Sequence, residues 1–367
     1  MAYPTGWGRR CELKIASSKV SANLSSFPVL LNEDTLPSEM FDADGSYPAL
    51  NGGGDIRFSS DEAGDTQLPC EVVSFVTDND PANGTAEIWV KVASVSSSAD
   101  TSIYVWYKKS GETQPAIDAT YGAENVWRSE YKLVSHDGGE TDSTSGGNDG
   151  TAEGGVTGGG ATGQIGVATT FDGSDDGFNV GDNAFRPGSS SFSLTTWAKT
   201  SSANRQRLFS KQEYGAPNKY FIFRVEGNTG YIETMYNDGL NNPNATGSTD
   251  RADGNWHYFA MVRDNVNDNI YGYVDKTTDC SEAQGALGDL DNESDMVIGR
   301  RNYDNTQGFV GEMDEVRYYF GVLSKNWIDT EYNNQSSPST FASSGSIQTI
   351  GTAPPATGHG MGMFFSY

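Results

Sequence analysis

The chain has 367 residues with 17 Phe, 18 Tyr and 7 Trp, so it carries the apolar side chains that disordered chains lack. Its formal net charge of −25, from 49 acidic and 24 basic residues, repels phosphate backbones and argues against a nucleic-acid partner. The N-terminal residues contain no apolar run of signal-peptide length, and no segment approaches the ~20 apolar residues of a membrane span. We therefore expect a folded, turn-rich protein without membrane insertion.

The first part of the chain is predicted to be an all-β domain, a β-sandwich, over residues 1–118. Segments such as "TAEIWVKV" and "SIYVWY" alternate apolar and polar residues with period two, which is typical of half-buried antiparallel strands. Turn clusters such as "NGGGD" separate these segments.

Residues 119–335 are predicted to be a second strand-rich domain that ends in one short helix. Its strands are expected at residues 191–199, 219–225, 230–236, 255–263, 270–275, 295–299 and 308–319. The helix is expected in "SKNWIDTEYNNQ", where Ser324 is a suitable N-cap. Many strands with one late helix indicate a β-sandwich with the helix packed on its edge.

Two segments of low complexity interrupt this pattern. The Gly-, Ser- and Thr-rich residues 136–163 are a flexible linker or, in our preferred interpretation, a long loop of the second domain. Residues 336–367 are expected to be a C-terminal tail. Because this tail ends in "GMGMFFSY", we expect it to insert into a neighbouring subunit or to fold back on its own sandwich.

An ordered series of motifs connects the second half of the chain to a known family. "TTFDGSDDGFNVGDN", "SFSLTTWAKT", "DGNWHYFAMVRD", "MVIGRRN" and "GFVGEMDEVRYYFGVLS" occur in this order and together resemble a LamG-like domain of the concanavalin A-like jelly-roll class. "DIRFSSDE" and "LPCEVVSF" in the first half resemble the uncharacterised β-domain often found upstream of such domains. The resemblance implies an extracellular or cell-surface setting.

The acidic segment "GFVGEMDEVRYYFG" resembles the closing strand of this family more than a catalytic site. Retaining glucanases use three acids at alternate positions of one strand, and retaining hydrolysis needs two carboxyl groups about 5–5.5 Å apart. Strand alternation places Glu312, Asp314 and Val316 on one face and Glu315 on the other. Because Val316 occupies the position of the carboxylate that acts as general acid/base in those glucanases, we expect no enzymatic activity.

A calcium ion is the cofactor that the sequence permits. The loop "FDGSDD" offers hard oxygen donors, and a carboxylate on a sandwich strand is costly to bury unless it is paired or metal-bound. The predicted calcium ligands are Asp172, Asp175, Asp176 and Asp314. The alternative for Asp314 is pairing with a basic residue or with backbone N–H groups. Of the three cysteines, Cys11 and Cys70 are left open as a disulfide pair or as free thiols.

Turn residues with aromatic, amide and carboxylate groups are the candidate ligand-binding residues, because sugar sites combine an aromatic face with planar hydrogen-bonding groups. They are Tyr214, Asn218, Tyr236, Asn237, Asp238, Arg301, Asn302 and Tyr303. Trp197 and Trp256 are expected to be core residues rather than sugar platforms. None of the histidines is expected to be catalytic.

The sequence therefore predicts a non-enzymatic structural or adhesion protein on a particle surface, with a phage or virus virion as the leading setting. Its partners would be a glycan or host-surface receptor and other virion subunits or copies of itself. A secreted or cell-surface carbohydrate-binding protein is the first alternative. A glycoside hydrolase with an incomplete carboxylate motif is the second.

Overall fold

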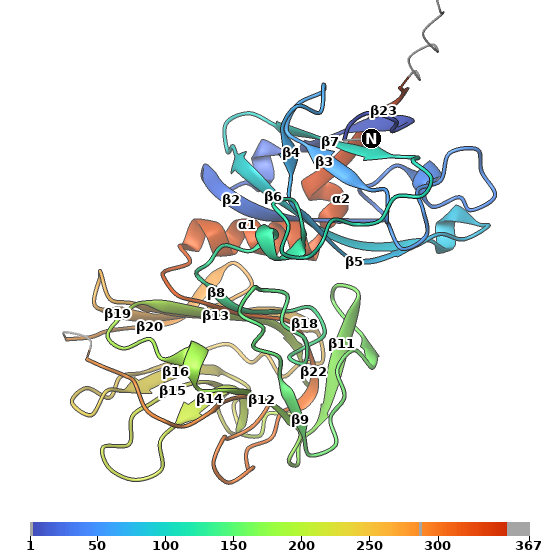
Figure 1. Cartoon of the computed structure of the whole chain (residues 1–367). Coiled ribbons are helices and arrows are strands. Elements are labelled where there is room, and N and C mark those ends of the chain that lie inside the picture. The colour runs from blue at the N-terminus through green and yellow to red at the C-terminus, as the bar shows by residue number, and fades with distance from the viewer. Residues whose placement is uncertain (1–2, 286–287, 351–367) are drawn as a thin grey trace, which may run out of the picture.

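Two β-sandwiches follow one another along the chain, with a helix between them (Figure 1). The computed structural model describes residues 3–285 and 288–350. Antiparallel sheets dominate both sandwiches, which confirms the predicted all-β class. Within the described ranges, no helix combines the length and the apolar character needed to cross a membrane.

The first sandwich packs a five-stranded sheet, in the order β23-β1-β7-β3-β4, against a three-stranded sheet, β2-β6-β5. Its strands are β1 (Arg9–Ile15), β2 (Leu24–Asn32), β3 (Arg57–Ser59), β4 (Gln67–Leu68), β5 (Cys70–Val76), β6 (Thr85–Val95), β7 (Thr101–Tyr107) and β23 (Ala342–Thr349). Side chains on one face of β6 pack between the two sheets, because Ile88 and Val90 lie two residues apart on the same face of the strand. Cys11, Cys70 and Cys280 are buried free thiols, so Cys11 and Cys70 do not pair.

The second sandwich packs two larger sheets, β10-β11-β22-β13-β18-β19-β20 and β17-β16-β15-β14-β21-β12-β9, and β8 also pairs with β22. Its strands are β8 (Tyr131–Ser135), β9 (Thr151–Glu153), β10 (Ala161–Thr162), β11 (Val167–Asp172), β12 (Gly177–Gly181), β13 (Phe192–Lys199), β14 (Gln206–Gln212), β15 (Tyr220–Val225), β16 (Ile232–Asn237), β17 (Asn244–Thr246), β18 (Trp256–Asp264), β19 (Asn269–Val274), β20 (Thr277–Ala283), β21 (Met296–Ile298) and β22 (Val310–Tyr319). The Gly-rich segment 136–163 supplies β9 and β10, so it forms part of this sandwich.

The end of the described chain returns to the first sandwich. Helix α1 (Lys325–Ser336) begins at Ser324, whose side chain accepts a hydrogen bond from the Trp327 N–H at 3.2 Å. After α2 (Pro338–Phe341), β23 pairs antiparallel with β1, from Ala342 opposite Ile15 to Thr349 opposite Arg9. The prediction that the tail starts at residue 336 is therefore wrong for residues 338–349. Residues 351–367, which include "GMGMFFSY", lie outside the described residues.

Helix α1 lies between the sandwiches rather than only on the edge of the second one (Figure 1). The Asn334 side chain accepts a hydrogen bond from the Leu30 N–H at 2.7 Å and donates one to the Leu30 carbonyl at 3.1 Å. These bonds satisfy backbone groups at the free edge of β2. On the other side, the Trp197 N–H donates to Gln335 at 2.6 Å.

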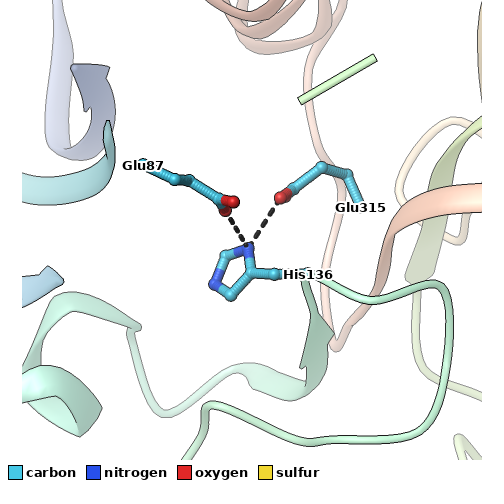
Figure 2. Close-up of side chains that lie close together, drawn as sticks. All are labelled: Glu87, His136 and Glu315. Carbon is cyan, nitrogen blue, oxygen red and sulfur yellow. Dashed lines mark hydrogen bonds and ion pairs between the residues drawn. The ribbon is translucent and has the colours of Figure 1, made fainter. Parts of the chain in front are cut away.

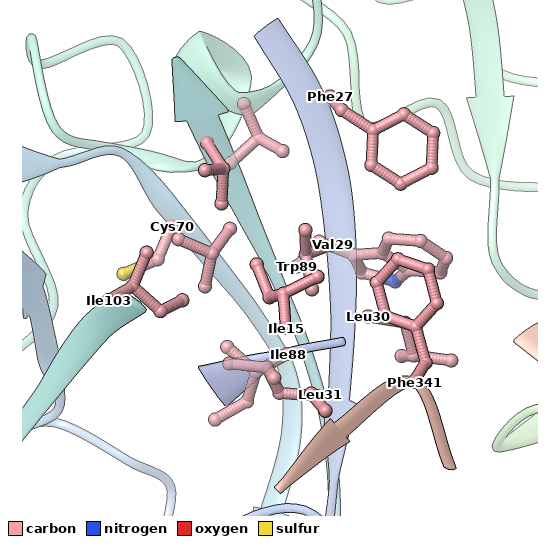
Figure 3. Close-up of a cluster of buried hydrophobic side chains, with 14 of the residues drawn as sticks. Ile15, Phe27, Val29, Leu30, Leu31, Cys70, Ile88, Trp89, Ile103 and Phe341 are labelled. Atoms are coloured by element: carbon pink, nitrogen blue, oxygen red, sulfur yellow. The ribbon is translucent and has the colours of Figure 1, made fainter. Parts of the chain in front are cut away.

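The core of the first sandwich continues across this interface. Figure 3 shows Phe341, from the C-terminal segment, beside side chains of β2 and β6. The same apolar cluster includes Trp197, Tyr258 and Tyr319 from the outer face of the second sandwich. The second sandwich has a separate interior cluster. Because buried apolar contacts are continuous between the sandwiches, we expect them to behave as one mechanical unit.

Candidate functional site

The closing strand β22 contains a β-bulge at Glu315. Glu315 has a φ of 51°, and the register between β13 and β22 shifts at this point. A bulge adds one residue to a strand and changes the faces on which its side chains lie. Met313 and Val316 lie in the interior of the second sandwich, whereas Asp314 and Glu315 both interact with residues at the domain interface. The prediction that Asp314 and Val316 share one face while Glu315 lies on the other is wrong.

The bulge directs Glu315 toward His136, which follows β8. The His136 Nδ1 atom lies 2.6 Å from Glu315 Oε1 and 3.3 Å from Glu87 Oε1, on β6 of the first sandwich (Figure 2). On the other side of the ring, Nε2 lies 3.4 Å from Glu71 Oε2 on β5. All four side chains are buried, so residues of both sandwiches meet around one imidazole.

Aromatic rings enclose this cluster. Trp89 stacks on His136 with ring centroids 5.5 Å apart and donates its N–H to Glu87 at 3.1 Å. Trp127 donates its N–H to Glu71 at 2.7 Å. Indole N–H groups therefore satisfy carboxylate oxygens that burial has removed from water.

Arg317 connects the cluster to helix α1. Its guanidinium pairs with Glu315 and with Glu331 of α1, and it lies 4.5 Å above the Trp89 ring centroid. Glu331 also accepts a hydrogen bond from the Tyr258 hydroxyl at 2.8 Å. The strand β22, the helix and the first sandwich are thus joined by one buried polar network.

Burial and neighbouring charges shift the pKa values of this network in opposite directions. Burial raises the pKa of Glu87 to about 7, against the attraction of His136. Burial also opposes ionisation of Glu315, but His136 and Arg317 outweigh it and hold its pKa below the usual range. For His136, burial lowers the pKa, and Glu315 and Glu71 outweigh this and raise it well above the usual value.

Asp314 lies beside this network under the loop 162–167. Its Oδ2 atom accepts a hydrogen bond from the Ile165 N–H at 2.8 Å, whereas its Oδ1 atom is buried without a hydrogen-bond partner. Burial, reinforced by Glu315, raises the Asp314 pKa well above its usual value. The alternative prediction, that Asp314 pairs with backbone N–H groups, therefore holds for Oδ2 but not for Oδ1.

The loop 162–167 approaches the acids closely because it contains glycine. Gly166 has a φ of 49°, and a Cβ atom there would lie 2.3 Å from Glu87 Oε2. Outside the loop, a cavity of about 610 Å³ opens between the sandwiches and is lined by residues of β2, β6 and this loop. The loop therefore separates the buried acids from an open groove.

We expect Gly166→Ala to destabilise the chain more than Gly181→Ala. Both glycines have a positive φ, so both alanines carry a backbone penalty of about 1–2 kcal/mol. Only at Gly166 does the new methyl group meet a buried, hydrogen-bonded side chain, which adds about 1–3 kcal/mol of overpacking. Urea unfolding measures both variants, and equal losses would show that the loop does not pack on Glu87.

Five of the predicted ligand residues lie at one end of the second sandwich. The Tyr214 ring is 82% exposed and lies 5.3 Å from the Tyr303 ring. Arg301 donates to the Tyr303 hydroxyl at 2.9 Å. Asn302 and Asn218 both interact with Gln212. We call Tyr214, Asn218, Arg301, Asn302 and Tyr303 the tyrosine surface.

Of the remaining three predicted ligand residues, two are buried. Tyr236 belongs to strand β16, is fully buried in the sandwich interior and lies under Arg263. Asp238 is also buried, and its carboxylate accepts hydrogen bonds from the backbone of Leu240 and Gly288. Asn237 is half-buried at the end of β16. The prediction that Tyr236 and Asp238 are exposed turn residues is therefore wrong.

The four predicted calcium ligands do not converge. Asp172 lies opposite Val310 in the β11–β22 pairing. Val310 is four residues before Asp314 along β22, so the Cα atoms of Val310 and Asp314 are about 13 Å apart. Asp176 accepts a hydrogen bond from the Asp172 N–H at 2.9 Å, so these two acids share a local turn. The prediction that Asp314 is a calcium ligand together with the other three acids is therefore wrong. Calcium binding by Asp172, Asp175 and Asp176 stays a prediction.

The buried network itself was not predicted from the sequence. Its members come from β5, β6, the residue after β8, β22 and α1, and these segments are far apart in the chain. His136 stands next to the Gly-rich segment and has no metal-ligand or catalytic spacing to mark it. The only local signal is the acidic group in β22, which the assumption of regular alternation misassigned.

The family comparisons agree with this architecture. The model of the concanavalin A-like lectin/glucanases superfamily matches residues 172–329. A domain of unknown function (DUF2341) matches residues 52–122. The chain therefore contains a concanavalin A-like domain preceded by a DUF2341 domain, which confirms the predicted arrangement. None of the curated proteins matches the chain significantly.

Several solved structures are similar to part of the chain. The binding domain of Paraclostridial Mosquitocidal Protein 1 has 13% identity and a TM-score of 0.45, with 55% of this chain and 52% of that chain covered. Domain 4 of AbnA, an extracellular arabinanase from Geobacillus stearothermophilus, in complex with arabinotriose, has 22% identity and a TM-score of 0.45, with 56% and 99% covered. A Ruminococcus gnavus sialidase CBM40 bound to α2,3-sialyllactose has 15% identity and a TM-score of 0.40, with 45% and 96% covered.

Proposed function

We propose that the chain is a non-enzymatic adhesion protein that binds a glycan or a glycan-bearing host receptor through the tyrosine surface. The observation that carries this proposal is the exposed ring of Tyr214 beside Tyr303. Exposed aromatic faces next to amide and guanidinium groups provide both the stacking and the hydrogen bonds that a sugar ring needs. Arg301 and Asn218 supply those polar groups, and Asn302 holds the loop by bonding to the Gln212 backbone.

The acids of β22 support the non-enzymatic part of the proposal. Glu312 is paired with Lys199 across the strands β13 and β22, at 2.5 Å. Asp314 and Glu315 are buried at the interface, and Val316 faces the sandwich interior. A retaining hydrolase needs two carboxyl groups on either side of a bound sugar, and these three acids do not offer a shared open face.

Display on a phage or virus particle is the setting that we propose for this adhesion protein, with other virion subunits or further copies of the chain as its structural partners. The alternative is a secreted or cell-surface carbohydrate-binding protein. Detection of the chain by mass spectrometry in purified particles would distinguish the two settings.

We expect Tyr214→Ala and Tyr303→Ala each to weaken glycan binding by about tenfold, because each removes one stacking face. A glycan array identifies the ligand, and titration calorimetry with the strongest hit measures the change. Val266→Ala is the matched control, since Val266 is 86% exposed in another turn. The same preparation should release no reducing ends from that glycan. Unchanged affinity in the double tyrosine variant would refute the tyrosine surface, and turnover lost in Glu312→Gln would refute the non-enzymatic assignment.

A further inference from the structure

We propose that Glu87, His136 and Glu315 bind one divalent transition-metal ion of the zinc class at the interface of the two sandwiches. One ligand atom from each of these side chains lies within 4.8 Å of the other two. Figure 2 shows the two carboxylates pointing toward the same ring nitrogen of His136. The set is distinct from the predicted calcium residues and from the tyrosine surface.

The donor chemistry selects the class of ion. One imidazole nitrogen with carboxylate oxygens suits zinc and its neighbours in the first transition row, whereas calcium and magnesium prefer oxygen ligands alone. The three donors come from β6, the residue after β8 and the bulge of β22. The strained φ of Glu315 is what brings its carboxylate to His136, so the backbone is shaped around this meeting point.

Each of the three ligands has a supporting contact with a residue outside the proposed set. Glu71 faces His136 Nε2 at 3.4 Å, which is the carboxylate–histidine arrangement that orients a metal-binding imidazole. Trp89 donates to Glu87, and Arg317 pairs with Glu315. When Nε2 carries the proton toward Glu71, the Nδ1 lone pair faces two carboxylate oxygens. That position requires a cation, which is either a proton or a metal ion.

The charge of the network is the second argument. Five carboxyl groups are buried here against two cationic side chains, Arg317 and His136. The carboxyl groups, each at most 8% exposed, are those of Glu71, Glu87, Asp314, Glu315 and Glu331. Unpaired buried charge is costly, so these carboxyl groups have to be neutralised either by protons or by a bound cation.

Asp314 provides an independent observation. Its Oδ1 atom is buried and has no hydrogen-bond partner, although it belongs to the residue next to Glu315. Asp314 is not one of the three ligands, but its unpartnered oxygen adds to the need for positive charge beside them. An ion held here would join β6 of the first sandwich to β22 of the second and would have a structural role.

The test uses the full chain after exhaustive chelation, followed by addition of Zn²⁺, Mn²⁺ or Ca²⁺ separately. We expect one zinc ion per chain by native mass spectrometry and an upward shift of the melting temperature, with a weaker response to Ca²⁺. Glu87→Gln should abolish stoichiometric binding, and Glu71→Gln should weaken it by about 10–100-fold. His257→Gln is the matched control, because His257 also contacts two carboxylates, Asp253 and Asp275, but is only partly buried and lies outside the network.

The proposal would be overturned if the wild-type chain bound no zinc. It would also be overturned if Glu87→Gln bound zinc as the wild type does, or if His257→Gln lost zinc binding. If Glu87→Gln fails to fold, anomalous diffraction from zinc-soaked wild-type crystals decides the question without a variant. A peak between the three side chains supports the site, and a peak only elsewhere refutes it.

Discussion

Arg317→Met is expected to lower the free energy of unfolding by about 3–5 kcal/mol, because removing one partner from a buried ion pair leaves uncompensated charge. Arg317 is 1% exposed and is the guanidinium partner of both Glu315 and Glu331. Methionine retains most of the aliphatic volume beside Trp89, so the loss reports mainly on the two carboxylates. Denaturant unfolding of the full chain gives the free energy directly.

The matched control for this change is Arg205→Met. Arg205 pairs with Glu226 on the surface of the second sandwich, and its side chain is 47% exposed. Exposed pairs contribute about 0–1 kcal/mol, so the control should remain close to wild type. Equal effects of the two substitutions would mean that the buried network adds no more stability than a surface ion pair.

Phe341→Ala is expected to destabilise the first sandwich by about 3–5 kcal/mol, the range for truncating a buried phenylalanine. Phe341 is fully buried, and its ring centroid lies 6.4 Å from that of Phe27 on β2. It is also the last residue before β23, so loss of its anchoring should loosen the pairing of β23 with β1. The Cys11 thiol is buried and hydrogen-bonds to the Gly345 carbonyl of β23 at 3.4 Å, which makes Cys11 a local reporter.

Two measurements test this second prediction. Urea unfolding gives the stability loss, and thiol labelling under native conditions, mapped by peptide mass spectrometry, should show faster modification of Cys11 in the variant. Ile347→Ala is the control, because Ile347 belongs to β23 but is 37% exposed. Wild-type stability and wild-type labelling in Phe341→Ala would show that Phe341 does not anchor β23 on the first sandwich.

The sequence by itself determined the β class, the two sandwiches and the positions of seven of the fifteen strands in the second one. The seven strands predicted there correspond to β13, β15, β16, β18, β19, β21 and β22, because period-two alternation and turn residues are local signals. The start of α1 was also predictable, since Ser324 caps it through a contact three residues away. Strand β14 was missed, because all but the last of its residues are buried and its pattern does not alternate.

Only the tertiary structure decided where the functional groups lie. The bulge at Glu315 reverses the face on which its side chain lies, and glutamate is not a residue whose identity marks a positive φ. The return of β23 to β1 pairs residues more than 300 positions apart, and no local pattern specifies such a partner. The buried network likewise joins Glu71, Glu87 and His136 to Glu315 because packing of one sandwich on the other brings them together. Local spacing encodes the elements, whereas long-range burial and charge pairing determine which elements meet.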